Sequence, residues 1–145
     1  MQHTKGQMKR VIVVRFDDGD ILIDEVKNLA KKEKISAGVI MFIGALRKGH
    51  VVTGPKAPKI PPSPHWESFK DAWEAVGMGT IFKGKKGPEV HIHGALGKKR
   101  RALAGCIRKD SKVFLLIEAV IFEIKGIKAS KDFDSRTGLN LLRFT

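Results

Sequence analysis

The sequence predicts one α+β domain over residues 1–145, with a mostly antiparallel or mixed β-sheet and one or two helices. The length suits a single hydrophobic core, and 42% of the residues are hydrophobic. One stretch has the apolar period of a helix, whereas the other apolar stretches are short, β-branched and separated by turn residues. A single helix among hairpin-linked strands is typical of the α+β class.

The N-terminal part supplies one strand and the helix. Residues 1–9 are polar and basic, and we expect them to form a flexible N-terminus. Residues 10–16 alternate and are β-branched, which predicts a strand. Asp17 to Asp20 then forms a turn whose last carboxylate can cap a helix. The apolar residues that recur at helical spacing after this turn are Leu22, Val26, Leu29 and Ala30.

Residues 37–53 are predicted to form two strands around a glycine. Residues 37–43 are a continuous apolar run, which is typical of a strand buried on both faces. Gly44 suits a bulge or a bend, and residues 45–53 continue as the next strand. Residues 54–65 hold five of the six prolines, so they form a surface loop, either ordered or flexible, rather than a central strand or a helix.

The C-terminal half is predicted to consist of strands joined by tight turns. Residues 66–72 have no clear pattern and stay unassigned. We expect strands over residues 73–82, 88–96, 102–107 and 113–124, then a Lys/Asp-rich connection and a final apolar stretch within 129–145. Gly77 and Gly79 lie in the first of these strands, at points where another backbone or a ligand comes close.

The composition indicates which cellular compartment to expect. Cys106 is the only cysteine, so an internal disulfide framework is excluded and nothing indicates an oxidising environment. The first residues contain no apolar signal segment. The longest apolar run, residues 113–124, includes Glu118 and Glu123 and is too short to cross a bilayer. We therefore expect a cytoplasmic protein without a membrane partner.

The formal net charge is +13, from 28 lysines and arginines against 15 acidic residues. This balance favours DNA or another anionic partner. A lysine-rich surface of the thermophile type explains it equally well, because asparagine and glutamine are scarce.

The basic residues gather in two turns. They are Lys83, Lys85 and Lys86 in the first turn and Lys98, Lys99, Arg100 and Arg101 in the second. The turns flank the strand 88–96, whose length at about 3.3 Å per residue separates them by roughly 30 Å. One protomer therefore does not present a single basic patch, although each turn remains a candidate nucleic-acid contact.

The chemically informative strand contains His91 and His93. Residues i and i+2 of a strand face the same side, so both imidazoles project together. Cys106 follows on the next predicted strand after a tight turn, so an antiparallel hairpin can bring its sulfur beside the two rings. Two histidines and one cysteine suit Zn²⁺ or a similar transition-metal ion, and three protein ligands leave a fourth position open.

Structural roles compete with this hypothesis. Two histidines at this spacing are often a polar face or a packed pair, and a lone cysteine is usually a small buried hydrophobe. Glu118 can orient a ligating imidazole or act as a base beside a metal-bound water, but it can equally pair with a lysine. His65, beside Trp66, is either a fourth ligand, a substrate contact or a surface residue.

Several segments together resemble a known family. The matching stretches are residues 15–22, 44–46, 79–81, 87–97 and 104–106, and they continue into the strand that holds Glu118 and Glu123. The most specific part is Pro-x-x-His-x-His, which runs from Pro88 to His93. These stretches resemble the plants-and-prokaryotes-conserved (PPC) domain, a domain of unknown function that accompanies AT-hooks in plant nuclear proteins.

The resemblance implies a homotrimer built on a mostly antiparallel sheet, and an association with nucleic acid. It also implies a metal-binding unit of three histidines, the third of them in a Gly-Gly-His element. This sequence has Ala104-Gly105-Cys106 there. Because thiolate is also a zinc ligand, the change either keeps binding with an altered ion preference or marks loss of the site. The sequence contains no Arg-Gly-Arg-Pro AT-hook.

Three functions remain as expectations. The first is a trimeric metal-binding protein that is associated with DNA or has a regulatory role. The second is a metal-dependent enzyme, in which the open metal position activates water on a small anionic substrate. The third is a trimeric structural module whose histidines only pack. These residues leave open whether the chain is an enzyme.

Overall fold

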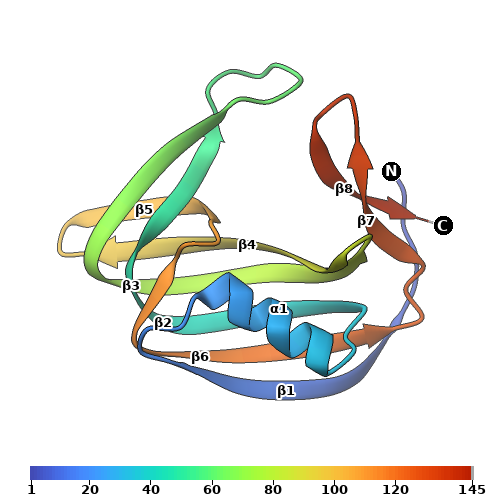
Figure 1. Ribbon diagram of the computed structural model, residues 1–145, viewed down its shortest axis with the longest axis horizontal. Coiled ribbons are helices and arrows are strands. Elements are labelled where there is room, and N and C mark those ends of the chain that lie inside the picture. Colours follow the sequence, from blue (N-terminus) through green and yellow to red (C-terminus); the bar gives the residue numbers. More distant parts are fainter. Residues whose placement is uncertain (145) are drawn as a thin grey trace.

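The computed structural model describes residues 1–144, which form eight strands and one helix (Figure 1). In chain order the elements are β1 (Gln7–Asp17), α1 (Leu22–Lys32), β2 (Ala37–Pro55), β3 (Pro64–Gly84), β4 (Gly87–Lys98), β5 (Arg101–Ile107), β6 (Lys112–Lys125), β7 (Ala129–Asp134) and β8 (Leu139–Phe144). This arrangement confirms the α+β class. Across residues 1–144, no helix is long and apolar enough to cross a membrane.

The strands form one sheet in the order β1-β6-β2-β5-β4-β3-β7-β8. The paired strands are antiparallel except β3 and β7, which are parallel. β2 and β3 also pair with each other along most of their length, and they curve together towards the proline-rich loop (Figure 1). The four strands β2 to β5 therefore close on themselves, which leaves few unpaired edges in this part of the sheet.

The core lies inside this curved sheet, and α1 covers it. Alternation along the strands turns Ile40 and Phe42 of β2 inward, together with Ile92 and Leu96 of β4, and all four are buried. The buried side chains of α1 are Leu22, Ile23, Val26 and Ala30. They include three of the four apolar positions whose spacing predicts the helix, so the helix packs on the sheet by its apolar face.

The opposite face of β2 is exposed, which corrects one expectation. Met41 and Ile43 are 49% and 59% exposed, so the apolar run 37–43 is not buried on both faces within this chain. An apolar run shows that residues avoid water, but it does not show which chain covers them. Gly44 is the expected bend, because its φ is +144° and the pairing of β2 with β6 shifts register after it.

Two other local expectations change, and two further segments receive an assignment. Residues 7–9, expected in a flexible N-terminus, belong to β1. The Asp20 carboxylate does not cap α1, because it accepts a hydrogen bond from the Asp17 amide at 2.9 Å, and Ile21 occupies the N-cap position. The unassigned residues 66–72 continue β3, and the C-terminal stretch forms the hairpin of β7 and β8.

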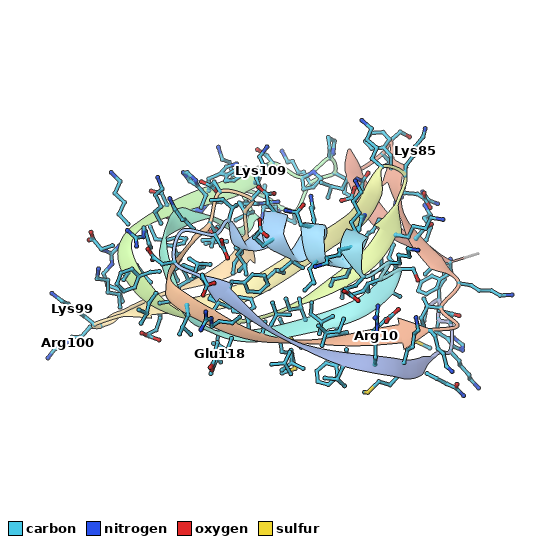
Figure 2. All side chains as sticks on the ribbon, turned by 60° about the horizontal axis from the view of Figure 1, so that its bottom comes forward. Arg10, Lys85, Lys99, Arg100, Lys109 and Glu118 are labelled. Carbon is cyan, nitrogen blue, oxygen red and sulfur yellow. The ribbon has the colours of Figure 1, made fainter. Side chains whose placement is uncertain are left out.

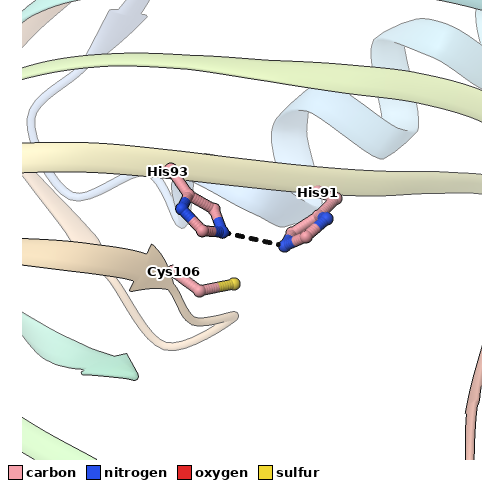
Figure 3. A group of neighbouring side chains, drawn as sticks. All are labelled: His91, His93 and Cys106. Atoms are coloured by element: carbon pink, nitrogen blue, oxygen red, sulfur yellow. Dashed lines mark hydrogen bonds between the residues drawn. The ribbon is translucent and has the colours of Figure 1, made fainter. Parts of the chain in front are cut away.

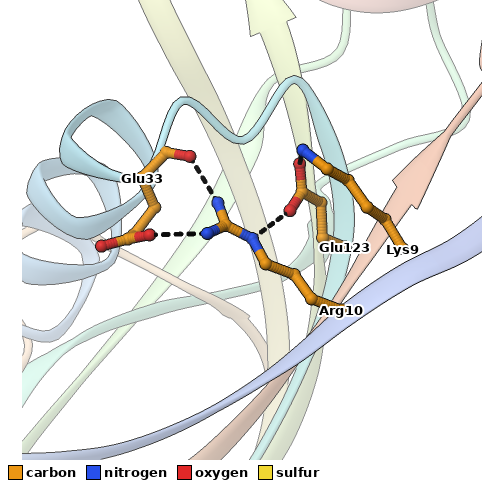
Figure 4. A network of polar contacts seen from close by, with 4 residues as sticks. All are labelled: Lys9, Arg10, Glu33 and Glu123. Atoms are coloured by element: carbon orange, nitrogen blue, oxygen red, sulfur yellow. Dashed lines mark hydrogen bonds and ion pairs between the residues drawn. The ribbon is translucent and has the colours of Figure 1, made fainter.

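Four charged residues, Lys9, Arg10, Glu33 and Glu123, join the helix to the sheet, and we call them the ion-pair network (Figure 4). The Glu123 carboxylate accepts hydrogen bonds from Arg10 and Lys9, the latter at 3.2 Å. Arg10 also donates to the Glu33 carboxylate at 2.9 Å and to the Glu33 carbonyl at 2.6 Å, where α1 ends. Burial by itself raises the pKa of Glu123, but the hydrogen bonds and the positive charges of Arg10 and Lys9 together outweigh burial and hold that pKa below its usual value.

Candidate metal centre

The three candidate ligands come from adjacent strands. His91 and His93 are exposed on β4, on either side of the buried Ile92. β4 pairs with β5 in a register that puts Cys106 directly opposite His93. Figure 3 shows the three side chains projecting into one space from these two strands. The hairpin therefore brings together the residues that the sequence selects, and we call His91, His93 and Cys106 the His/Cys cluster.

The donor atoms have a spacing that suits a single ion. The nitrogen and sulfur donors of the cluster lie within 4.8 Å of one another, and the two Nε2 atoms are 3.1 Å apart. Around a tetrahedral zinc ion, two imidazole nitrogens lie about 3.3 Å apart, and a nitrogen and a thiolate lie about 3.6 Å apart. The imidazoles thus match this spacing, and the sulfur would have to move by no more than about 1 Å.

The electrostatic surroundings affect the two ligand types differently. Partial burial of the ring, the neighbouring His93 and the charges of Lys131 and Arg108 all lower the pKa of His91, which favours the neutral imidazole at pH 7. Burial raises the pKa of the Cys106 thiol, although Arg108 acts in the opposite direction. The imidazole is therefore ready to bind a metal ion, whereas the thiol has to release a proton to do so.

An open pocket of about 540 Å³ adjoins the cluster, and His91 and Cys106 form part of its wall. The other polar and aromatic members of the wall are Lys27, His50, Trp66, Arg108, Lys109 and Asp110. The sequence reasoning missed this pocket. One feature of the sequence could have indicated it: Arg108 stands two residues after Cys106, and in an extended chain such residues project to the same side of the strand. The other members come from distant segments, and no local pattern joins them.

Two further candidate residues lie elsewhere. Glu118 of β6 stands opposite Ile43 and lines a second pocket, in which Glu74 also takes part. At this level of the sheet β2 and β3 separate β6 from β4, so one chain does not bring Glu118 to the His/Cys cluster. His65 hydrogen-bonds to the Thr53 hydroxyl at 3.0 Å and lies outside the cluster.

The two basic turns lie at opposite ends of the molecule, as the length of β4 predicts. The first turn joins β3 to β4, and the second joins β4 to β5. Figure 2 shows Lys85 at one end and Lys99 with Arg100 at the other. One chain therefore carries two separate basic ends.

The His/Cys cluster shares its side of the sheet with exposed apolar residues. His93 stands opposite Met78, and Met78 stands opposite Met41 on β2. The exposed apolar residues on this side, which we call the apolar face, are Val11, Val13, Met41, Ile43, Val76 and Met78. Monomeric proteins rarely leave a contiguous apolar surface of this kind in water.

Solved structures of other proteins share this fold. A plant- and prokaryote-conserved (PPC) protein from Pyrococcus horikoshii is 24% identical, with a TM-score of 0.86 over 100% of this chain and 99% of that one. A metal-containing protein from Archaeoglobus fulgidus is 22% identical, with a TM-score of 0.86 over 99% of each chain. A candidate DNA-binding protein from Ralstonia eutropha is 15% identical, with a TM-score of 0.76 over 92% of this chain and 90% of that one. No curated protein matches the sequence.

Sequence identities at this level show only a shared fold, whereas a match to a family model shows family membership. The model of the Plants and Prokaryotes Conserved (PCC) domain matches residues 3–125. The matched segment contains β1 to β6 and the whole His/Cys cluster, whereas the hairpin of β7 and β8 lies beyond it. Because the match covers most of the sequence, from the first strand to the last residue of β6, the chain belongs to the Plants and Prokaryotes Conserved domain family.

Proposed function

We propose that this chain is a metal-binding protein that holds Zn²⁺ or a similar transition-metal ion through His91, His93 and Cys106. The observation that carries the proposal is the convergence of three nitrogen and sulfur donors within 4.8 Å. Zinc accepts this mixed donor set, and three protein ligands leave a fourth position for water or another ligand. The shared fold with a metal-containing protein from Archaeoglobus fulgidus supports the proposal.

Elemental analysis of the purified protein, before and after incubation with zinc, tests the metal site. We expect about one ion per chain, and loss of the ion in the His91→Ala variant because only two donors remain. The matched control is His65→Ala, which removes a histidine outside the cluster and should keep the ion. Wild-type protein that stays free of metal after incubation with zinc contradicts the proposal.

We further propose that the chain assembles as a homotrimer through the apolar face. Burying this face would remove its exposed apolar side chains from water, which favours association. The His/Cys cluster lies on the same side of the sheet, so assembly would put it at or near a junction between subunits. Analytical ultracentrifugation tests the assembly, and Met78→Glu should give monomers because it places a charge in the face. A monomeric wild-type protein contradicts the trimer.

Association with DNA is the biological role that we propose for the assembled protein. The net charge of +13 supports it, as does the shared fold with a candidate DNA-binding protein from Ralstonia eutropha. The affinity for duplex DNA should fall steeply as salt rises, and it should weaken when the lysines and arginines of the two turns are neutralised. Binding that is absent or insensitive to salt contradicts this role.

A metal-dependent enzyme acting on a small anionic substrate is the second candidate function. The open pocket favours it, because a substrate there would lie beside the His/Cys cluster. A bound zinc ion supplies Lewis acidity and activates water. Turnover of small phosphate and carboxylate esters, dependent on metal and lost in His91→Ala, would support the enzyme. Metal-loaded protein without turnover of any such ester contradicts it.

A further inference from the structure

We propose that Arg108, with Lys27 and Lys109, binds a small oxyanion, a carboxylate or phosphate group, in the pocket beside the His/Cys cluster. The use of this site in catalysis rests on the second candidate function, because the oxyanion would belong to that enzyme's substrate. Binding of the oxyanion does not depend on that function, and it can be measured separately.

The charges in the pocket do not balance. Lys27 of α1 and the consecutive residues Arg108 and Lys109 line it, against the single carboxylate of Asp110. That carboxylate is already engaged by Nδ1 of His50. Among residues 1–144, none of the three cations forms an ion pair. The pocket therefore keeps a positive charge that an anionic ligand can neutralise.

The Arg108 side chain is held in place by an aromatic ring, and its Nε atom has no acceptor within residues 1–144. Its Cζ atom lies 5.1 Å from the centre of the Trp66 ring, in a cation–π contact that orients the guanidinium group. The Trp66 ring in turn meets the His50 ring edge-on. The Nε atom of Arg108 is buried and has no hydrogen-bond partner within residues 1–144. Buried donors normally have a partner, so this unpaired N–H group favours an acceptor beside Arg108.

The guanidinium group is the side chain best suited to this ligand class. Its planar fork can donate two parallel N–H bonds to one carboxylate or phosphate group, and a lysine adds a point charge. β5 pairs with β4 only from His93 onward, so residues 87–92 of β4 pair with β3 alone in the part of the chain that the structure describes. This open strand edge leaves room for a ligand between β4 and the segment that follows β5.

The position of Arg108 ties the oxyanion site to the His/Cys cluster. Arg108 follows Cys106 by two residues, and both line the pocket together with His91. An oxyanion bound by Arg108 therefore lies next to the donor atoms of the cluster. A substrate with an oxyanion at one end would be positioned there with its remaining atoms near the ligand position that the three protein donors leave open.

Isothermal titration of the full chain with inorganic phosphate, at low ionic strength, tests the site. We expect Arg108→Gln to weaken phosphate binding at least about tenfold, because the fork and its charge are both lost. The matched control is Arg100→Gln, which removes the same charge from the distant turn after β4 (Figure 2) and should change the affinity less than about twofold. Arg108→Lys keeps the charge without the fork, so it should bind phosphate with intermediate affinity. Equal affinities in Arg108→Gln and Arg100→Gln overturn the proposal.

Two further measurements separate this site from the metal proposal. The metal content of Arg108→Gln should equal that of the wild type, because Arg108 is not a ligand. Phosphate binding through Arg108 in a wild-type protein that takes up no metal would support the oxyanion site and remove the metal-binding function. Malonate replaces phosphate in a parallel titration, and the tighter of the two probes identifies the group that the site prefers. A wild-type protein that binds neither probe overturns the proposal.

Discussion

The ion-pair network and the His/Cys cluster both gather polar side chains on one sheet, but they differ in how far these groups satisfy one another. In the network every charged side chain pairs with one of opposite charge. Glu123 accepts hydrogen bonds from Arg10 and Lys9, and Arg10 also donates one to Glu33 (Figure 4). In the cluster, each imidazole forms a side-chain hydrogen bond only with the other among residues 1–144 (Figure 3). The thiol makes one weak contact with a backbone carbonyl at 3.9 Å.

This difference separates a structural region from a region available for binding. Groups that already satisfy one another have little left to offer a ligand, and removing one of them leaves the others without a partner. Nitrogen and sulfur donors that converge with few other partners can turn their lone pairs to a metal ion once that ion displaces their protons. We therefore expect changes in the network to alter stability and changes in the cluster to alter metal binding.

His93→Ala should produce the largest effect, and it should act on binding alone. One of three donors is lost, so we expect the affinity for zinc to fall at least about 100-fold, since the loss of a hydrogen-bond partner behind a ligand already costs about 10- to 100-fold. The stability of the metal-free protein should change little, because His93 is exposed. Competition with a chromogenic chelator measures the affinity, with Glu123→Gln as the control. Equal loss of zinc in both variants would break the distinction between the two regions.

Glu123→Gln should act on stability and leave zinc binding intact. Glu123 is 4% exposed, and the substitution removes the charge that Arg10 and Lys9 share. We expect the free energy of unfolding to fall by about 2 kcal/mol, the scale of hydrogen bonds to a charged group. Denaturant titration at constant protein concentration measures the change. If the exposed Glu67→Gln variant loses as much, the network has no special structural role.

The pH dependence of stability should reveal the same carboxylate with a smaller effect. The pKa of Glu123 is lowered in the folded chain, so its contribution to stability is present above the unfolded-state pKa of about 4.3 and is lost as the pH falls through the folded value. From about pH 5 to pH 3, wild-type stability should therefore fall more steeply than that of Glu123→Gln. Denaturation midpoints at successive pH values measure the slopes. Parallel profiles would show that Glu123 does not contribute to the acid sensitivity.

Cys106→His should produce the smallest change. This variant restores the histidine that the family resemblance implies at this position, and imidazole and thiolate are both good zinc ligands. We expect the zinc affinity to change less than about tenfold, whereas Cys106→Ala should lose as much as His93→Ala. The same chelator competition measures both variants. An affinity for Cys106→His as low as that for Cys106→Ala would show that Cys106 does not act as the third ligand.

The His/Cys cluster could be predicted from the sequence because it depends on local rules. His91 and His93 share a face through the two-residue period of a strand. Cys106 reaches them because a short turn joins β4 to β5 and sets the register of the hairpin. The fold class and most strands likewise follow from patterns among residues that are close in the sequence, and the helix follows from the spacing of its apolar residues.

The oxyanion pocket could not be predicted in this way, because it depends on pairing between distant strands. Val52 of β2 stands opposite both Cys106 and Trp66, and this double pairing brings Trp66 to Arg108. No spacing in the sequence indicates that β2 bends far enough to meet β5. The exposure of Met41 could not be predicted either. An apolar pattern in the sequence does not distinguish a residue of the core from a surface residue that another chain can cover.

The apolar face and the His/Cys cluster lie on one side of the sheet. In the trimer proposed above, a neighbouring subunit would cover the apolar face and lie close to the His/Cys cluster. Metal occupancy and assembly would then be reciprocally coupled, so that each raises or lowers the equilibrium constant of the other by the same factor. Where assembly raises the metal affinity, the amount of bound metal would depend on the protein concentration, and dilution alone would release metal from the chain.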